Sequence, residues 1–91
     1  MVSDTGTNSI LIGSENKVAG GKHNFAAGQN NELQSGSDYS IALGAGNTVS
    51  GVASLVIGSG NQSTGSYTVV TGYKNGATGV YSYAGGTDTF A

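Results

Sequence analysis

The chain has no cysteine, no arginine and only three lysines among its 91 residues. Without cysteine it can form neither a disulfide framework nor a thiolate metal site. A net charge of −2 provides no electrostatic footprint for nucleic acid, so we expect no DNA or RNA partner. No apolar run approaches the roughly 20 residues of a membrane helix, and the first residues, MVSDTGTN, lack the basic and apolar regions of a signal peptide. We therefore expect no direct membrane contact from this chain.

Large apolar side chains are also scarce. Ile, Leu, Val and Phe together supply 18 residues, which is close to the ~20% below which chains tend toward disorder. The 17 glycines add to the entropy that folding must overcome, because glycine has the most backbone freedom to lose. A monomer of this composition is expected to be marginally stable, and self-association would offset its weak core.

Groups that could carry catalysis are few and scattered. His23 is the single histidine and lies in an irregular stretch, where a solvated or turn-bonding role is favoured over a ligand role. The five carboxylates are Asp4, Glu15, Glu32, Asp38 and Asp88. They form no catalytic or metal-ligand spacing with the histidine, so we expect no enzymatic activity, no cofactor and no metal.

Glycine sets the period of the chain. From Gly44 to Gly86 it recurs at every seventh position. A hydrophobic half-unit, such as SLVIG ending at Gly58, alternates with a polar one, such as NQSTG ending at Gly65, so the full repeat is about fourteen residues. Glycine at the strand ends permits the positive φ of a tight turn. The expected turn glycines are Gly13, Gly28, Gly44, Gly51, Gly58, Gly65, Gly72, Gly79 and Gly86.

A seven-residue period also suggests a coiled coil, but the residues between the glycines do not suit a helix. Val, Ile, Thr, Tyr and Ser in runs of four or five favour short strands and turns. The repeat predicts an all-β solenoid of about six coils, with two short strands per coil and a height of roughly 28 Å at ~4.8 Å per layer. The first two coils carry extra residues, which predicts bulged turns near Gly21 and Ser35.

An asparagine stands three residues after each of the first five glycines that end a hydrophobic half-unit, and the sixth unit has Thr89 there. Because equivalent residues of stacked coils lie over one another, we predict a ladder of side-chain amides that bond from layer to layer. This structural role is favoured over a ligand role. The ladder comprises Asn16, Asn31, Asn47, Asn61 and Asn75.

Strand alternation divides the apolar residues between two faces. Positions one and three before each glycine share one face, and the position between them points the other way. Both faces are apolar, whereas a two-stranded coil has one interior, so the second face predicts a partner surface. Which face meets other subunits stays open. The residues assigned to core or trimer packing are Ile10, Ile12, Phe25, Ile41, Leu43, Leu55, Ile57 and Val69.

The repeated motif resembles the YadA-like head domain of trimeric autotransporter adhesins. The match lies in the units NSILIG (8–13), YSIALG (39–44) and ASLVIG (53–58), which alternate with a polar unit that contains the asparagine. It covers about residues 8 to 86, so we expect a head-domain fragment over 8–91 after a leader at 1–7. Neck, stalk and anchor sequences of the family are not found, so the chain is expected to be a piece of a longer fibre.

The resemblance implies a left-handed parallel β-roll, three copies of which pack side by side as a homotrimer. It also implies display on the outer membrane of a Gram-negative bacterium, as an adhesin for host matrix proteins or host cell surfaces. The ligand-binding residues of the family follow no transferable motif, so none is carried over to this chain.

Tyrosine is concentrated in the final third of the chain. Tyr67 and Tyr81 occupy equivalent positions and are expected to stack, while Tyr73 and Lys74 are the candidate ligand-contact residues.

Two other functions stay open. A phage tail-fibre segment is also trimeric and repetitive. An ice-binding solenoid needs a flat threonine array, whereas Thr64, Thr71 and Thr78 occupy differing positions in their coils.

Overall fold

The structure is a computed structural model that describes residues 3–4, 9–19, 23–34, 37–89 and 91. Within them the chain is all-β and forms two parallel six-stranded sheets. The long sheet contains the five-residue strands β2 (Ile10–Ser14), β4 (Phe25–Gln29), β6 (Ile41–Ala45), β8 (Leu55–Ser59), β10 (Val69–Tyr73) and β12 (Tyr83–Thr87). The short sheet contains the two-residue strands β1 (Ser3–Asp4), β3 (Lys17–Val18), β5 (Glu32–Leu33), β7 (Thr48–Val49), β9 (Gln62–Ser63) and β11 (Gly76–Ala77).

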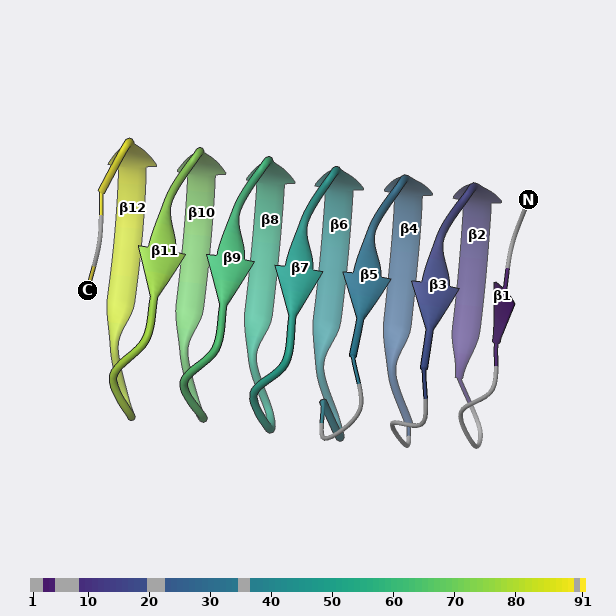
Figure 1. The fold of residues 1–91 in the computed structure, drawn as a ribbon, viewed down its shortest axis with the longest axis horizontal. Coiled ribbons are helices and arrows are strands. Elements are labelled where there is room, and N and C mark those ends of the chain that lie inside the picture. The colour runs from purple at the N-terminus through teal and green to yellow at the C-terminus, as the bar shows by residue number, and fades with distance from the viewer. Residues whose placement is uncertain (1–2, 5–8, 20–22, 35–36, 90) are drawn as a thin grey trace.

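The chain winds as a solenoid of about five turns, in which each coil contributes one strand to each sheet (Figure 1). In Figure 1 the long strands lie behind the short ones and run upward, the short strands run downward, and successive coils advance from right to left. The path of the chain in Figure 1 therefore describes a left-handed winding. The longest dimension, 29 Å, runs along the stack and agrees with the height predicted from about six coils. The all-β solenoid prediction is therefore confirmed.

The pairing register reproduces the glycine period. Ile41 pairs with Leu55 and Leu55 with Val69, each 14 residues further on. The earlier coils are longer, because Ile10 pairs with Phe25 after 15 residues and Phe25 with Ile41 after 16. The bulged turns predicted near Gly21 and Ser35 lie outside the described residues, but the register places the extra residues between Val18 and Phe25 and between Leu33 and Ile41.

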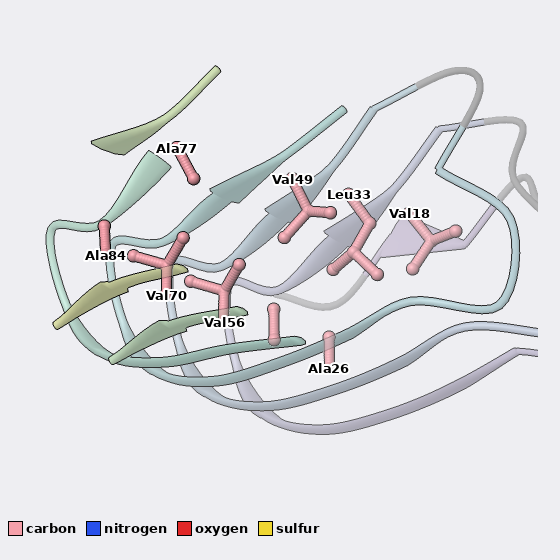
Figure 2. Close-up of a cluster of buried hydrophobic side chains, with 9 residues drawn as sticks. Val18, Ala26, Leu33, Val49, Val56, Val70, Ala77 and Ala84 are labelled. Atoms are coloured by element: carbon pink, nitrogen blue, oxygen red, sulfur yellow. The ribbon is translucent and has the colours of Figure 1, made fainter. Parts of the chain in front are cut away.

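The interior is narrow and holds one row of small apolar side chains from each sheet (Figure 2). The long sheet contributes the middle residue of each apolar triplet, and the short sheet contributes the second residue of its strands. Figure 2 shows the two rows facing one another. The fully buried members are Val18, Ala26, Leu33, Ala42, Val49, Val56, Val70, Ala77 and Ala84. The Cα trace extends only 12 Å along its shortest axis, and Leu33 is the largest fully buried side chain of the interior.

The glycines of the hydrophobic half-units lie inside the long strands rather than at the corners, which differs from the expectation. Gly58 is the fourth residue of β8 and has φ +128°. A Cβ at this position would lie 1.9 Å from the carbonyl oxygen of Gly72 in the next coil. Gly51, in the other half-unit, has no positive φ, but a Cβ there would lie 1.8 Å from the oxygen of Gly65. Both columns are therefore set by the close approach of stacked backbones.

The solenoid also begins earlier than the sequence suggested. Ser3 and Asp4 form β1 and pair with Lys17 and Val18, although both lie within the range expected to be a leader. In the sequence, valine rather than asparagine stands before Ser3, so the residue type that marks the other coils is absent there. Its sequence signature is missing for that reason.

Candidate functional site

The five ladder asparagines are buried at one corner of the solenoid, between the long and short strands of each coil. The Asn61 side chain is 1% exposed, and its Oδ1 accepts a hydrogen bond from the backbone N–H of Asn75 at 2.9 Å. Asn61 in turn donates its own backbone N–H to Asn47 Oδ1 at 3.0 Å. The column ends when the Thr89 N–H donates to Asn75 Oδ1 at 2.7 Å. The ladder therefore runs mainly from side chain to backbone.

The amide nitrogens of the same column hold the strand ends together. Asn61 Nδ2 donates to the carbonyl of Ile57 in its own coil at 3.1 Å and to the carbonyl of Gly72 in the next coil at 3.0 Å. Direct amide–amide bonds join the earlier steps, where Asn31 Nδ2 donates to Asn16 Oδ1 at 3.1 Å and Asn47 Nδ2 to Asn31 Oδ1 at 3.0 Å. Every buried side-chain nitrogen and oxygen in the described part of the chain has a partner. The ladder consequently has no unused buried group to offer a ligand.

A second polar column lies at the opposite corner and was missed in the sequence. Ser54 donates its N–H to Ser40 Oγ at 3.1 Å, and Thr68 Oγ1 donates to Ser54 Oγ at 3.1 Å. Ser54 Oγ also donates to the Gly65 carbonyl at 3.2 Å. The signal was present, because a small polar residue stands four positions before each long-strand glycine. The column comprises Ser9, Asn24, Ser40, Ser54, Thr68 and Ser82, and the Asn24 N–H donates to Ser9 Oγ at 3.4 Å.

The largest apolar feature is the outer face of the long sheet, which we call the outer stripe. It contains the residues one and three positions before each long-strand glycine, including all those assigned to core or trimer packing. Ile12 and Ile57 are 55% and 38% exposed, so their side chains lie outside the interior. The other assigned residues are exposed or half-buried on the same face: Ile10, Phe25, Ile41, Leu43, Leu55 and Val69. The sequence left open whether these side chains pack in the core or between subunits. They do not lie in the core, and their contact with other subunits stays a prediction.

The corners contain two columns of residues with left-handed backbone. One column follows the long strands and has φ between 55° and 67°: Glu15, Asn30, Gly46, Gly60, Lys74 and Asp88. Glycine and asparagine adopt this conformation readily. The other column precedes the long strands, and aromatic residues occupy four of its five positions, at a cost of roughly 1 kcal/mol or more each. We call it the aromatic corner: His23, Tyr39, Ala53, Tyr67 and Tyr81, with φ between 55° and 59°.

The rings of the aromatic corner stack in pairs. His23 and Tyr39 lie with ring centroids 5.1 Å apart, and Tyr67 and Tyr81 lie 5.2 Å apart with an interplanar angle of 12°. The stacking expected of Tyr67 and Tyr81 is thus present. Ala53 lies in register between the two pairs, because Leu55 pairs with Ile41 on one side and with Val69 on the other.

Tyr73 and Lys74, the candidate ligand-contact residues, lie at the end of β10 and are both exposed. The Lys74 ammonium is 5.2 Å from the Tyr73 ring centroid, a cation–π contact. This contact is local to one coil, and neighbouring coils have Ser59 and Thr87 in register with Tyr73. The pair therefore does not extend into a repeated surface.

The titratable groups are dispersed over the surface. Lys17 Nζ lies 4.0 Å from Glu32 Oε2, and both side chains are more than a third exposed. Among the described residues no three His, Asp or Glu side chains gather into a cluster that could hold a metal ion, and no pocket opens. The described part also contains no helix long and apolar enough to cross a membrane.

The threonines do not form one array. Thr71 lies in β10 on the outer stripe, whereas Thr64 and Thr78 follow short strands and are exposed on the other side of the coil.

Compared with known protein families and with curated protein sequences, the chain matches none.

Proposed function

We propose that this chain is the head module of a trimeric bacterial surface adhesin of the YadA-like kind, and that three copies pack side by side through the outer stripe. The sequence resemblance and the parallel solenoid support the same reading. Its place would be the outer surface of a Gram-negative bacterium. Its partners would be host matrix proteins or host cell surfaces.

The outer stripe is the observation that carries this proposal. Large apolar residues occupy most of its positions from β2 to β8, where Ile10 and Ile12 are 54% and 55% exposed and Ile41 is 39% exposed. A continuous apolar surface of this kind is typical of a protein interface. Because the interior contains mainly alanine and valine, burial of the stripe would also supply stability that the single coil stack lacks.

Adhesion by such a head is polyvalent. No pocket opens in the described part of the chain, so binding would use extended turn and edge surfaces repeated in three copies. Three weak contacts on one axis raise the overall avidity without a strong single site.

Sedimentation equilibrium at micromolar concentration tests the assembly. We expect three times the 8.9 kDa mass of one chain. Ile57→Asp places a charge on the outer stripe and should give a folded monomer, because the charge would be buried without a partner in the trimer. Gln62→Asp, on an exposed position of the short sheet, is the matched control and should leave the trimer intact. A compact, stable monomer of the unmodified chain would contradict the proposal.

Adhesion is tested separately with the assembled protein. The trimer should bind immobilised extracellular-matrix proteins, and the Ile57→Asp monomer should bind far more weakly because avidity is lost. A stable trimer that binds neither matrix proteins nor host cells would favour a fibre segment, such as that of a phage tail, over an adhesive head.

A further inference from the structure

We infer that the Ala53 step of the aromatic corner is a binding site for one aromatic side chain of a partner polypeptide, held between the rings of Tyr39 and Tyr67. This inference goes beyond the proposed adhesive function and does not depend on trimer formation. It rests on the order of side chains along the corner.

The register places Tyr39, Ala53 and Tyr67 in three successive layers. The backbone confirms this order, because the Ala53 N–H donates to the carbonyl of Asp38 at 2.7 Å and the Tyr67 N–H to that of Val52 at 2.8 Å. All three residues have φ between 55° and 58°, so their Cα–Cβ bonds leave the corner in the same direction. At this corner, Tyr39 and Tyr67 therefore lie on either side of a layer whose side chain is only the methyl group of Ala53.

The spacing suits one inserted ring. Adjacent rings in this column lie 5.1 and 5.2 Å apart, about one layer of the solenoid. Tyr39 and Tyr67 are two layers apart, which is about 10 Å. A ring at the level of Ala53 would stack on both tyrosines at the spacing that the column already uses. Offset stacking at this distance is favourable for aromatic pairs.

Aromatic residues occupy four of the five corner positions, although left-handed backbone disfavours bulky side chains. Ala53 has the same φ, so the fold sets the backbone there, and the rings are a separate feature of the sequence. Tyr39 stacks on His23 and Tyr67 on Tyr81, yet the two tyrosines remain 63% and 53% exposed, so much of each side chain is free to contact a partner. Exposed tyrosines instead offer rigid contact area at low entropic cost, as binding surfaces require.

The chemistry of the surface favours a protein side chain over a nucleobase. Proteins that stack bases combine aromatic rings with a positively charged groove. This chain has no arginine and a net charge of −2. An aromatic side chain needs only the two ring faces, and the open corner would admit it from solvent.

Titration with N-acetyl-L-tryptophanamide tests the site. The protein has no tryptophan, so excitation selective for indole observes the probe without a tryptophan signal from the protein. We expect weak but saturable binding, with NMR ring-current shifts centred on the Ala53 methyl group and on the Tyr39 and Tyr67 rings. Shifts confined to the outer stripe would overturn the inference.

The variants follow from the column itself. Ala53→Tyr completes the ring stack and should abolish binding, because tyrosine already adopts the same backbone conformation in the neighbouring layers. Ala53→Gly keeps the site open and should bind like the parent. Equal binding by Ala53→Tyr and Ala53→Gly would overturn the inference.

A second pair of variants covers the case in which Ala53→Tyr does not fold. Tyr67→Ala removes one wall of the site and should weaken binding about 2- to 10-fold, the effect of one lost stacking contact. Tyr81→Ala removes a ring that does not border Ala53, so it should bind like the parent. Equal loss of affinity in both variants would contradict a site at Ala53.

Discussion

The side-chain oxygen of Asn61 accepts a hydrogen bond from the backbone N–H of Asn75, one coil further along the chain, at 2.9 Å. The same side chain donates to two carbonyls, one in its own coil and one in the next. One buried amide thus joins two layers through three bonds. It acts at the corner between a long and a short strand, where its oxygen serves as the acceptor for the Asn75 N–H.

Asn61→Ala should therefore lower the free energy of unfolding by about 2–4 kcal/mol, because it removes three hydrogen bonds and leaves buried partners unpaired. Urea denaturation followed by circular dichroism measures the change. Gln62→Ala alters the exposed neighbour and should stay within about 0.5 kcal/mol of the parent. Similar losses in both variants would show that the ladder contributes no special stability.

Gly58→Ala is expected to be among the most damaging small substitutions, with a loss of more than about 4 kcal/mol or complete unfolding. The added Cβ would meet the Gly72 oxygen at 1.9 Å, and backbone cannot move aside as a flexible side chain can. Gly46→Ala is the control, since the nearest atom to its Cβ is 3.9 Å away at φ +67°. It should cost only roughly 1–2 kcal/mol of left-handed strain. Thermal unfolding of the two variants compares them directly.

Val56→Asp should abolish folding, whereas Ile57→Asp should leave each chain folded. Val56 is fully buried between the sheets, and an unpaired carboxylate there has no hydrogen-bonding partner. Ile57 is the next residue and lies on the outer stripe, where water reaches it in the single chain. Far-ultraviolet circular dichroism should show strand content for the second variant alone. Folded Val56→Asp protein would mean that the interior is assigned to the wrong face.

The ion pair between Lys17 and Glu32 should contribute little. Both side chains are well exposed and the charged atoms are 4.0 Å apart, so solvent screens the attraction. Glu32→Gln is expected to change the free energy of unfolding by less than about 1 kcal/mol, at low and at high salt. A larger loss that salt abolishes would reveal a stronger electrostatic role for this edge.

Much of the coil geometry could be predicted from the sequence because two residue types have strict spatial requirements. Only glycine fits where stacked backbones approach as closely as at Gly58, and only asparagine offers both a donor pair and an acceptor at the position of Asn61. These requirements repeat with the coil. The period, the number of strands per coil and the column of amides follow from them.

The assignment of inside and outside could not be predicted in the same way. Both faces of the long strands are apolar, so alternation alone does not distinguish Val56 from Ile57. In the structure the alanines and valines of the middle positions lie in the interior together with Leu33, and the isoleucines of the flanking positions lie on the outer stripe. Side-chain size was therefore the informative property, whereas hydrophobicity was not.

The aromatic corner also went unpredicted, although its stacked tyrosines were expected. Turn chemistry favours glycine and asparagine at positive φ, so nothing marked Tyr39 or Tyr67 as corner residues. Each of these residues precedes a long strand, and the pairing register of that strand fixes the backbone that leads into it. The positive φ is therefore imposed by the stacking of the coils. Such positions become visible only when the coils are stacked.

The uniform register of β6, β8 and β10 makes the solenoid a molecular ruler. Ile41, Leu55 and Val69 occupy the same position in successive coils, so removal of residues 55–68 would bring Ile41 beside Val69 in an unchanged pairing. Each such coil sets about 4.8 Å of height. Because a coil contacts only its neighbours, genetic gain or loss of fourteen residues would change the reach of the molecule in fixed steps and leave the remaining coils as they are.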